Sequence, residues 1–445
     1  MPKIILADAS PEKRLFIHLL TRDIPLVAAF LDLLDNSINA AVEPYSSRLR
    51  TAADYETLLK DDAIKPSVAI SITLNSDKIE IRDNASGISV KTAEDHVFKF
   101  GRAVDEPHES DRLSVYGIGL KRAVFKLGNQ ISITSEHRSG GFDLKLDVAS
   151  WADRAKSEEW KIPISARDPV VPEKCGTTII VTELYDEIKR RIADGVFEGQ
   201  LREAIARTYA YYMTKFVTIS VSGKVVEPVE IAIGSNHYSD ILTLDGVTCA
   251  ITAGIGIPTA GQFRDNTSGW FVFCNGRAVI SADKSPLTGW GGSGQIFQPK
   301  HRPFVGTVFF AAENGEKLPW TTTKAAINED SAIWQLAKRH MLSVSQPVIS
   351  YLNNRYSDEG TEVSSKELQI AAGEQTTMLV AAVSEKRSFE PPSKQASPPT
   401  TRIQYDATEK EIKSIAVYLK KPSMSGSAVG RWTFDYFLRN EVEDQ

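Results

Sequence analysis

The chain has 445 residues, of which 42% are hydrophobic, and this is enough apolar material for two or three globular domains. Its formal net charge of −5 argues against a surface coated for nucleic acid, and its three cysteines have no metal-ligand spacing, so neither a zinc site nor a disulfide framework is indicated. No apolar run approaches the roughly 18 residues that a membrane span needs, and the start is too soon acidic for a signal peptide, so the sequence predicts a cytoplasmic protein without a membrane partner.

The first informative element is a helix with Asp23 expected as its N-cap and Pro25 in its first turn. At about 100° per residue its large apolar side chains fall on one side. The opposite side carries a narrow wedge of polar residues: Asp32, Asp35, Asn36 and Asn39. A solvent-facing surface is one reading, but such surfaces usually use better helix formers than Asp and Asn. A ligand-facing role is therefore favoured, because the Asn36 carbonyl and a carboxylate one turn away suit a magnesium ion and the water near it.

A hairpin is expected next, with strands from Val68 to Leu74 and from Ile79 to Arg82. Asp83 then stands where a strand ends, and Gly87 lets the backbone approach a ligand closely or take a positive φ. An ordinary Asp-Asn turn after the strand is the alternative.

Two glycines, Gly117 and Gly119, directly precede a helical pattern from Leu120 to Leu127, with Lys121 in its first turn. Backbone N–H groups at a helix start, next to glycines, form an anion site. The alternative is a helix that happens to begin with glycines. The chain has no P-loop motif, so that phosphate-binding device is excluded.

These stretches, in this order, resemble the GHKL superfamily, the gyrase, heat-shock chaperone, histidine kinase and MutL type of ATPase. The resemblance implies an α+β protein: a Bergerat-type α/β sandwich ATPase domain, a transducer-like βαβ domain and a small C-terminal module. It implies that Asp32 is the general base, that Asn36 binds Mg and that Asp83 receives the adenine amino group. The nucleotide-binding set that it implies is Asn36, Asp83, Gly87, Ile88, Gly117, Ile118, Gly119, Leu120, Lys121 and Thr177.

Three positions depart from the family pattern. Asp32 stands where Glu is usual, Ala85 where Gly is common and Asn39 where Asp is common. Asp is one methylene shorter than Glu, so proton abstraction has a poorer geometry. These departures bear on the rate of ATP hydrolysis, which is expected to be slow, more than on nucleotide binding.

The second half of the chain resembles the transducer domain of the gyrase B, MutL and MORC branch, and the chain looks closest to MORC-like and MutL-like proteins. The features are a helix from Phe197 to Phe216, a strand from Val217 to Val221, a strand from Trp270 ending in Asn-Gly-Arg277, and a loop containing Lys324. The resemblance implies that Lys324 reaches the terminal phosphate and is a second catalytic residue. By itself, the Thr-Thr-Lys sequence would be read as a surface loop.

The expected organisation is an ATP-binding domain with an N-terminal arm (1–190), a transducer-like domain (195–355), a flexible linker (356–400) and a strand-helix-helix module (401–445). A lid is expected over residues 99–113, where the family has one. The expected function is an ATPase that uses ATP and Mg and closes as an ATP-gated homodimeric clamp, acting on duplex DNA. The alternatives are a chaperone-like clamp on protein clients and a nucleotide-gated binding module with little turnover. Lys300, His301 and Arg302 are candidates for a basic groove, or form an exposed flexible loop.

Overall fold

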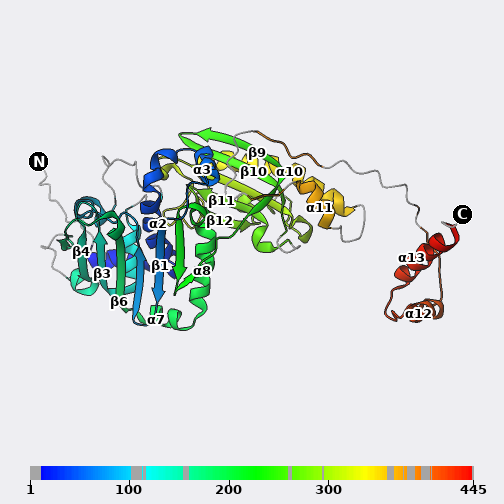
Figure 1. Cartoon of the computed structure of the whole chain (residues 1–445), viewed down its shortest axis with the longest axis horizontal. Coiled ribbons are helices and arrows are strands. Elements are labelled where there is room, and N and C mark those ends of the chain that lie inside the picture. Colours follow the sequence, from blue (N-terminus) through cyan, green and yellow to red (C-terminus); the bar gives the residue numbers. More distant parts are fainter. Residues whose placement is uncertain are drawn as a thin grey trace, which may run out of the picture. The chain divides into compact units, whose positions relative to one another are not determined.

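The computed structural model describes residues 12–101, 113, 117–153, 160–258, 263–292, 295–357, 365–373, 375–377, 386–391, 401 and 403–442. The chain falls into two compact units, residues 1–392 and 393–445 (Figure 1). The expected N-terminal arm and lid lie largely outside the described residues.

The first sheet contains, among the described residues, eight strands in the order β5-β4-β3-β6-β2-β1-β7-β8. They are β1 (Val68–Leu74), β2 (Lys78–Asp83), β3 (Gly128–Glu136), β4 (Phe142–Asp147), β5 (Ile164–Ala166), β6 (Gly176–Leu184), β7 (Val217–Val221) and β8 (Lys224–Val225). Figure 1 shows β4, β3, β6 and β1 in this order across the sheet, and β2 lies between β6 and β1. The hairpin of β1 and β2 is confirmed, and the sheet is mixed, because β2 pairs antiparallel with β1 and β6 while β1 and β7 pair in parallel.

One face of this sheet is buried and the other faces solvent. In β1, Ile70 and Ile72 are buried while Ala69 and Ser71 are exposed, as the twofold period of a strand requires. The helices of this part of the chain are α1 (Lys13–Arg22), α2 (Leu26–Val42), α3 (Ala52–Lys60), α4 (Val90–Thr92), α5 (Gly119–Leu127), α6 (Val148–Asp153), α7 (Asp186–Ala193), α8 (Val196–Thr208) and α9 (Ala210–Lys215). Helix α5 packs on β3 and β6, and α2 packs on α5 and α8.

Helix α2 begins one residue after Pro25, which occupies the N-cap position with φ −59° and ψ 142°. Asp23 is therefore not the N-cap, as the sequence had suggested. It ends the preceding helix α1 and pairs with Arg22 at 3.0 Å. The expected helix from Phe197 to Phe216 is likewise two helices, α8 and α9, separated at Tyr209.

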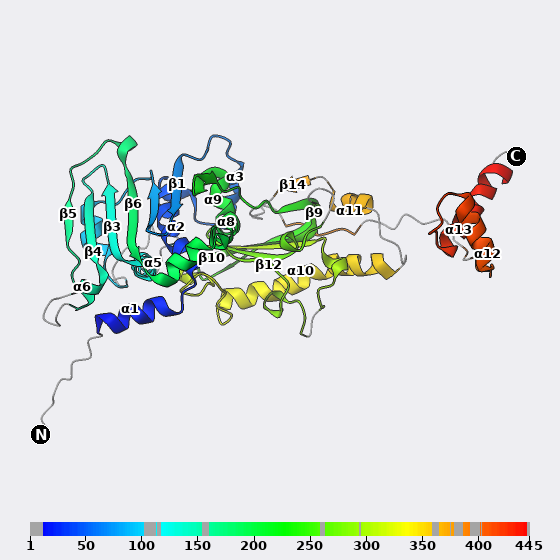
Figure 2. The same ribbon diagram turned by 90° about the horizontal axis from the view of Figure 1, so that it is seen from below.

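The second sheet has, within the described part of the chain, six strands in the order β12-β11-β13-β10-β9-β14. They are β9 (Ala232–Leu244), β10 (Val247–Gly256), β11 (Gly269–Cys274), β12 (Arg277–Asp283), β13 (Phe304–Ala311) and β14 (Gln375–Thr377). Helix α10 (Ala332–Ser357) packs on β10 and β13, and α11 (Ser365–Ala372) packs on β9 and β10. Figure 2 shows α10 running along this sheet.

The two sheets share one hydrophobic core. The ring of Tyr55 in α3 lies 5.0 Å from that of Phe309 in β13, and Phe30 in α2 lies 5.5 Å from Phe197 in α8. Because β7 and β8 belong to the first sheet, the expected boundary near residues 190–195 does not separate the sheets. A side chain from the second sheet's loops can therefore reach the first sheet's helices.

The expected linker over residues 356–400 needs correction, since parts of it complete the second sheet. Helix α11 buries Leu368, Ala371 and Ala372, and β14 pairs with β9. The backbone of Arg387 also bridges to Ser239 in β9. A segment whose apolar side chains are buried against a sheet is part of the folded unit and is not a solvated linker.

The second unit is a helical hairpin of α12 (Glu409–Tyr418) and α13 (Gly426–Phe437). The Thr408 hydroxyl caps α12, and Ala416 and Val429 are buried between the helices. The strand expected over residues 401–406 is not present among its described residues, 401 and 403–406. A strand needs a neighbour for its backbone hydrogen bonds, and the described part of this unit supplies helices instead.

Candidate functional site

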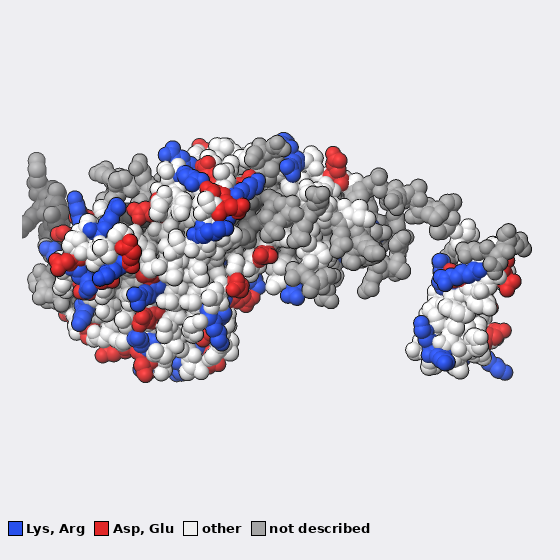
Figure 3. All heavy atoms as spheres, in the orientation of Figure 1, with Lys and Arg blue, Asp and Glu red and all other residues white. Residues whose placement is uncertain are grey.

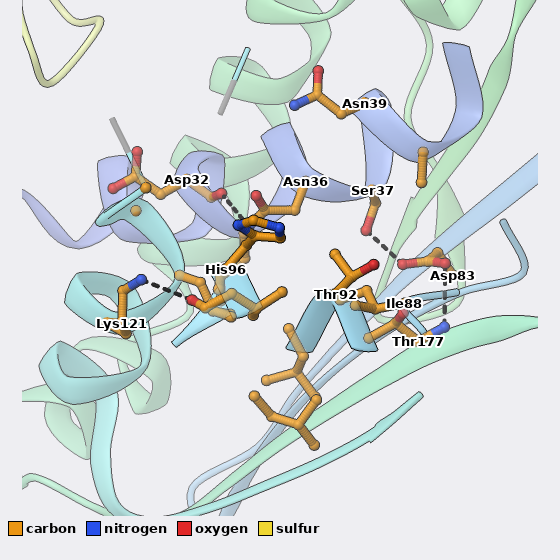
Figure 4. A pocket seen from close by; sticks show the side chains of 18 of the residues that line it. Asp32, Asn36, Ser37, Asn39, Asp83, Ile88, Thr92, His96, Lys121 and Thr177 are labelled. Atoms are coloured by element: carbon orange, nitrogen blue, oxygen red, sulfur yellow. Dashed lines mark hydrogen bonds between the residues drawn. The ribbon is translucent and has the colours of Figure 1, made fainter. Parts of the chain in front are cut away.

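A cavity of about 510 Å³ lies beside α2, between the end of β2 and the start of α5. Every residue that the sequence predicted for the site lines it, from Asp32 to Lys324. Figure 4 shows Asp83, Ser37 and Thr177 at one end, and Asp32 and Lys121 at the other. Asn36 lies between them, on the same helix as Asp32 and Ser37.

Asp83 is the polar centre of one end. Its Oδ2 accepts a hydrogen bond from the Ser37 hydroxyl at 2.7 Å, and its Oδ1 accepts from the N–H groups of Ala85 at 3.1 Å and Thr177 at 3.3 Å. Burial raises the pKa of Asp83, although these hydrogen bonds oppose the shift. The arrangement holds a buried acceptor at the edge of the sheet, where a donor on a ligand can meet it.

Two glycines allow the backbone to close around this end. Gly87 has φ +69°, and a Cβ there would lie 2.0 Å from the carbonyl oxygen of Glu136. Gly176 has φ +153°, and a Cβ there would lie 2.3 Å from the carbonyl oxygen of Asp83. Any larger residue would push the loop away from the neighbouring strand.

The Asn36 amide nitrogen donates to the backbone oxygen of Asp32 at 3.2 Å, so its carbonyl oxygen is the atom suited to a metal. Lys121 lies in the first turn of α5, as predicted, but its ammonium donates to the backbone oxygen of Val97 at 2.7 Å and to that of Lys99. Lys121 thus anchors the segment before residue 102 as well as lining the cavity.

Asp32 is paired with Arg122, which the sequence did not single out. Arg122 Nε and Nη2 lie 2.9 Å and 2.5 Å from the same oxygen, Asp32 Oδ2, and both side chains are buried. Burial raises the pKa of Asp32, opposed by the nearby charges of Lys324 and Arg122. Arg122 follows Lys121 directly in the sequence. It lies in the first turn of α5, and its side chain contacts Asp32 on α2.

Asp35 lies on the same helix but is held in a second group of charges. Its Oδ1 accepts from Arg277 Nε at 3.0 Å, its Oδ2 accepts from Lys324 Nζ at 2.5 Å, and the Tyr209 hydroxyl lies 2.7 Å from Oδ1. Burial alone would raise the pKa of Asp35, but Arg277 and Lys324 outweigh it and the pKa is lowered. Burial raises the pKa of Tyr209 well above its usual value, which keeps the phenol neutral.

The sequence had placed Asp35 in a ligand-facing wedge with Asp32, Asn36 and Asn39. The other three line the cavity, whereas the Asp35 side chain is fully buried against Arg277, Lys324 and Tyr209. Ser37, Arg122 and Tyr209 were missed by sequence reasoning, because nothing in their local sequence marks them. Arg277 was noted only as the end of an Asn-Gly-Arg strand.

Comparison with known proteins supports the part of this site that lies within residues 24–177. Residues 24–177 match the family model of the histidine kinase-, DNA gyrase B- and HSP90-like ATPases. A comparison with curated proteins gave no match. The matched range contains Asp32, Asn36, Asp83 and Thr177, and it excludes Lys324. The match supports a GHKL-type ATPase domain in this range and suggests that it binds ATP.

Two further findings concern metals and membranes. The described residues contain no group of three or more His, Cys, Asp or Glu side chains arranged to hold a metal ion. Within the same residues, no helix is long and apolar enough to cross a membrane.

Proposed function

We propose that this chain is a magnesium-dependent, ATP-binding and ATP-hydrolysing GHKL ATPase. The observation that carries the proposal is the single cavity of about 510 Å³, lined by predicted residues from stretches that are far apart in sequence. A chance set of surface motifs would have no reason to converge on one cavity. The family match over residues 24–177 gives independent support.

The two ends of the cavity suit the two ends of ATP. At one end the buried Asp83 carboxylate would accept a hydrogen bond from the adenine amino group, with Gly87 beneath the base. At the other, the backbone around Gly117 and the N-terminus of α5 would hold the phosphates.

The donor set fits magnesium. Mg²⁺ keeps several waters and takes one or two oxygen ligands from the protein together with substrate phosphates, so the Asn36 carbonyl is a sufficient protein ligand. A bound Mg²⁺ would supply neutralisation of phosphate charge. Asn36 would orient it, through a helix position fixed by the buried face of α2.

For hydrolysis, Asp32 would accept a proton from the water whose oxygen attacks the terminal phosphorus, while the bond to the ADP oxygen breaks. The Lys324 ammonium would stabilise the charge on the transferred phosphoryl group. Asp32 lies on α2 and Lys324 lies in a loop between β13 and α10, so catalysis would depend on the packing of these two parts of the first unit.

One observation favours a second candidate, a nucleotide-gated binding module with little turnover. Arg122 Nε and Nη2 both donate to one oxygen of Asp32, and this pairing makes Asp32 a weaker base. Slow hydrolysis is therefore part of the proposal, and negligible hydrolysis is its alternative.

We further propose that ATP closes the protein as a homodimeric clamp on DNA, in the manner of MORC-like and MutL-like proteins, with cytoplasmic location. On the face drawn in Figure 3, basic and acidic side chains are interleaved over the first unit. Of the residues expected in a basic groove, His301 is buried and bonded to Asn353, and Arg302 is paired with Asp265. The support for DNA is therefore the resemblance alone, and a protein client remains the alternative.

Phosphate release by the purified chain, with and without duplex DNA, tests the activity. We expect slow release that DNA accelerates, and release should fall by about 10² to 10⁴ in Asp32→Ala with nucleotide affinity largely kept. Acceleration by an unfolded protein client instead of DNA would favour the chaperone. Saturable binding of ATP without release would favour the binding module. Solution mass with a non-hydrolysable analogue reports the dimer.

A further inference from the structure

A buried group of charged side chains joins helix α2 to the second sheet, beside the nucleotide cavity. Asp35 is at its centre, bonded to Arg277 through Oδ1 and to Lys324 through Oδ2, with the Tyr209 hydroxyl on the Oδ1 side. The Asp35 side chain is 0% exposed, and those of Arg277 and Lys324 are 4% and 6% exposed. Lys324 also lines the cavity, so this buried group borders the space where a ligand would bind.

The backbone of Lys324 is held separately from its ammonium. Arg277 Nη1 donates to the Lys324 carbonyl at 2.6 Å, and the Lys324 N–H donates to the Thr321 carbonyl at 2.8 Å. The loop is closed by pairing of Trp320 with Ile327, and it keeps Lys324 at φ +53°, a left-handed conformation that is unusual for a lysine. The side chain can therefore change its partner by rotation while the loop stays in place.

The charges around the cavity leave Lys324 as the cation best able to move. The buried cations there are Arg122, Arg277 and Lys324, which bond to the carboxylates of Asp32 and Asp35, and Lys121, which bonds to backbone oxygens. Asp83 is a third buried carboxylate that lines the cavity. Asp32 and Asp35 each have an arginine of their own, so a turn of the lysine away from Asp35 leaves neither of them without a cation. These four cations and three carboxylates leave an excess of one positive charge, which favours an anionic ligand nearby.

We propose that Asp35 and the terminal phosphate of ATP compete for the Lys324 ammonium, and that Arg277 and Tyr209 keep Asp35 paired when the lysine turns to the phosphate. The inference rests on the proposed function, because it needs a nucleotide in the cavity. It makes Asp35 a positioning residue that sets the preference for ATP over ADP. A stronger interaction of Asp35 with Lys324 lowers the preference for ATP over ADP, and a weaker interaction raises it. The reason is that only ATP has the terminal phosphate that Lys324 would contact, and a ligand shifts an equilibrium only through differential contacts.

The test is titration of the full chain with ADP and with AMP-PNP, a non-hydrolysable ATP analogue, both with Mg²⁺. Asp35→Asn keeps the shape of the side chain and removes its charge. We expect the preference for AMP-PNP over ADP to rise about threefold or more, with ADP affinity within about twofold of the parent. In a Lys324→Ala background, the same substitution should change nothing, because the contested ammonium is gone.

Tyr209→Phe is the second variant, since Asp35→Asn leaves Arg277 without its carboxylate and can fail to fold. It keeps the carboxylate and removes the hydroxyl beside Oδ1, so Asp35 should hold Lys324 more strongly and the preference for AMP-PNP should fall. Asp143→Asn is the matched control. It removes a carboxylate on β4 that is paired with Arg167, and it should leave the preference for AMP-PNP unchanged.

The outcomes separate the inference from the proposed function. If both variants fold, the inference requires that the preference for AMP-PNP over ADP increases in Asp35→Asn and decreases in Tyr209→Phe. If only Tyr209→Phe folds, the inference requires the decrease in that variant. An unchanged or opposite preference in a folded variant overturns the inference while the nucleotide site stands. A parent chain that binds neither nucleotide would overturn the proposed function, and the inference with it.

Discussion

At the scale of single residues, Asp83 shows how distant partners orient a residue that a local motif places at the cavity. Its position at the end of β2 was readable from the sequence, because strand and turn residues flank it. Its partners were not, because Ser37 lies 46 residues before it and Thr177 lies 94 residues after it. These hydrogen bonds orient both carboxylate oxygens.

Replacing Asp83 with Asn should lower ATP affinity at least about tenfold, or roughly 1.4 kcal/mol, because a charged acceptor in a buried site is lost. Calorimetric titration with Mg-ATP measures this. Asp77→Asn, in the turn before β2, is the control and should bind normally. Near-parental affinity of Asp83→Asn would remove Asp83 from the adenine site.

The pair of Asp32 and Arg122 leads to a prediction about how stability and turnover depend on pH. Burial raises the pKa of Asp32, and Lys324 and Arg122 oppose the rise. Because the folded-state pKa lies above the unfolded one, the stability linked to Asp32 is present at acid pH and is lost as pH rises through the folded pKa.

Arg122→Gln removes one opposing cation, so the pKa of Asp32 should rise further. We expect the acid limb of the turnover profile to move to higher pH, and the free energy of unfolding to fall more at neutral than at acid pH. Turnover and denaturant unfolding across pH measure both. Arg167→Gln, which breaks a more exposed ion pair, should neither move the acid limb nor change stability in a pH-dependent way. An equal loss of stability at all pH values in Arg122→Gln would contradict the pairing of Arg122 with Asp32.

At the scale of elements, the pairing of β2 with β6 aligns two sides of the cavity's end at Asp83. Asp83 pairs with Thr177 at the last register position, and Gly176 precedes it at φ +153°. Helix α2 adds the third side, with Asn36 facing the cavity and Asp35 facing Arg277. Two adjacent residues of one helix thus face different surroundings, one the cavity and the other the second sheet.

Gly176→Ala should therefore weaken both folding and nucleotide binding. Its Cβ would lie 2.3 Å from the carbonyl oxygen of Asp83, so the strand end must shift, and a loss of about 1 to 3 kcal/mol of stability is expected. Thermal unfolding and ATP titration measure the two effects.

Gly199→Ala is the matched control, because a Cβ in that part of α8 meets nothing within 4 Å. It should raise stability by about 0.5 to 1 kcal/mol and leave ATP binding unchanged. If Gly176→Ala behaves like Gly199→Ala, the close approach of β6 to Asp83 is not what shapes the site.

At the scale of the whole molecule, the boundary between the two units lies at residues 392 and 393, inside the linker that the sequence suggested and near its end. Residues up to 391 contribute to the first unit, since Phe389 is buried and Arg387 bridges to β9. Residues 403–442 form a separate helical hairpin with little buried surface of its own.

A chain that ends at residue 392 should therefore keep the melting temperature of the first unit within about 2 °C and keep its ATP affinity. A chain that ends at residue 357 loses α11 and β14, which cover β9, and should melt several degrees lower. Calorimetric melting of both truncations measures this. Equal destabilisation by the two cuts would show that the first unit depends on the second.

The sequence by itself determined the local parts of this protein. The hairpin before Asp83, the glycines before α5 and the polar wedge of α2 follow from strand period, turn chemistry and helix period, which act over a few residues. Those same motifs carried the resemblance that the family match supports over residues 24–177. The roles of Asp32, Asn36 and Asp83 stay predictions.

Only the tertiary structure decided which charges meet. Arg122 lies 90 residues from Asp32, and Arg277 and Lys324 lie 242 and 289 residues from Asp35. No local pattern encodes such pairs, because a buried carboxylate is stabilised by whichever cations the packing of both sheets brings within hydrogen-bond reach. The sequence could show that α2 has a polar face, and the fold alone divided that face between the cavity and the second sheet.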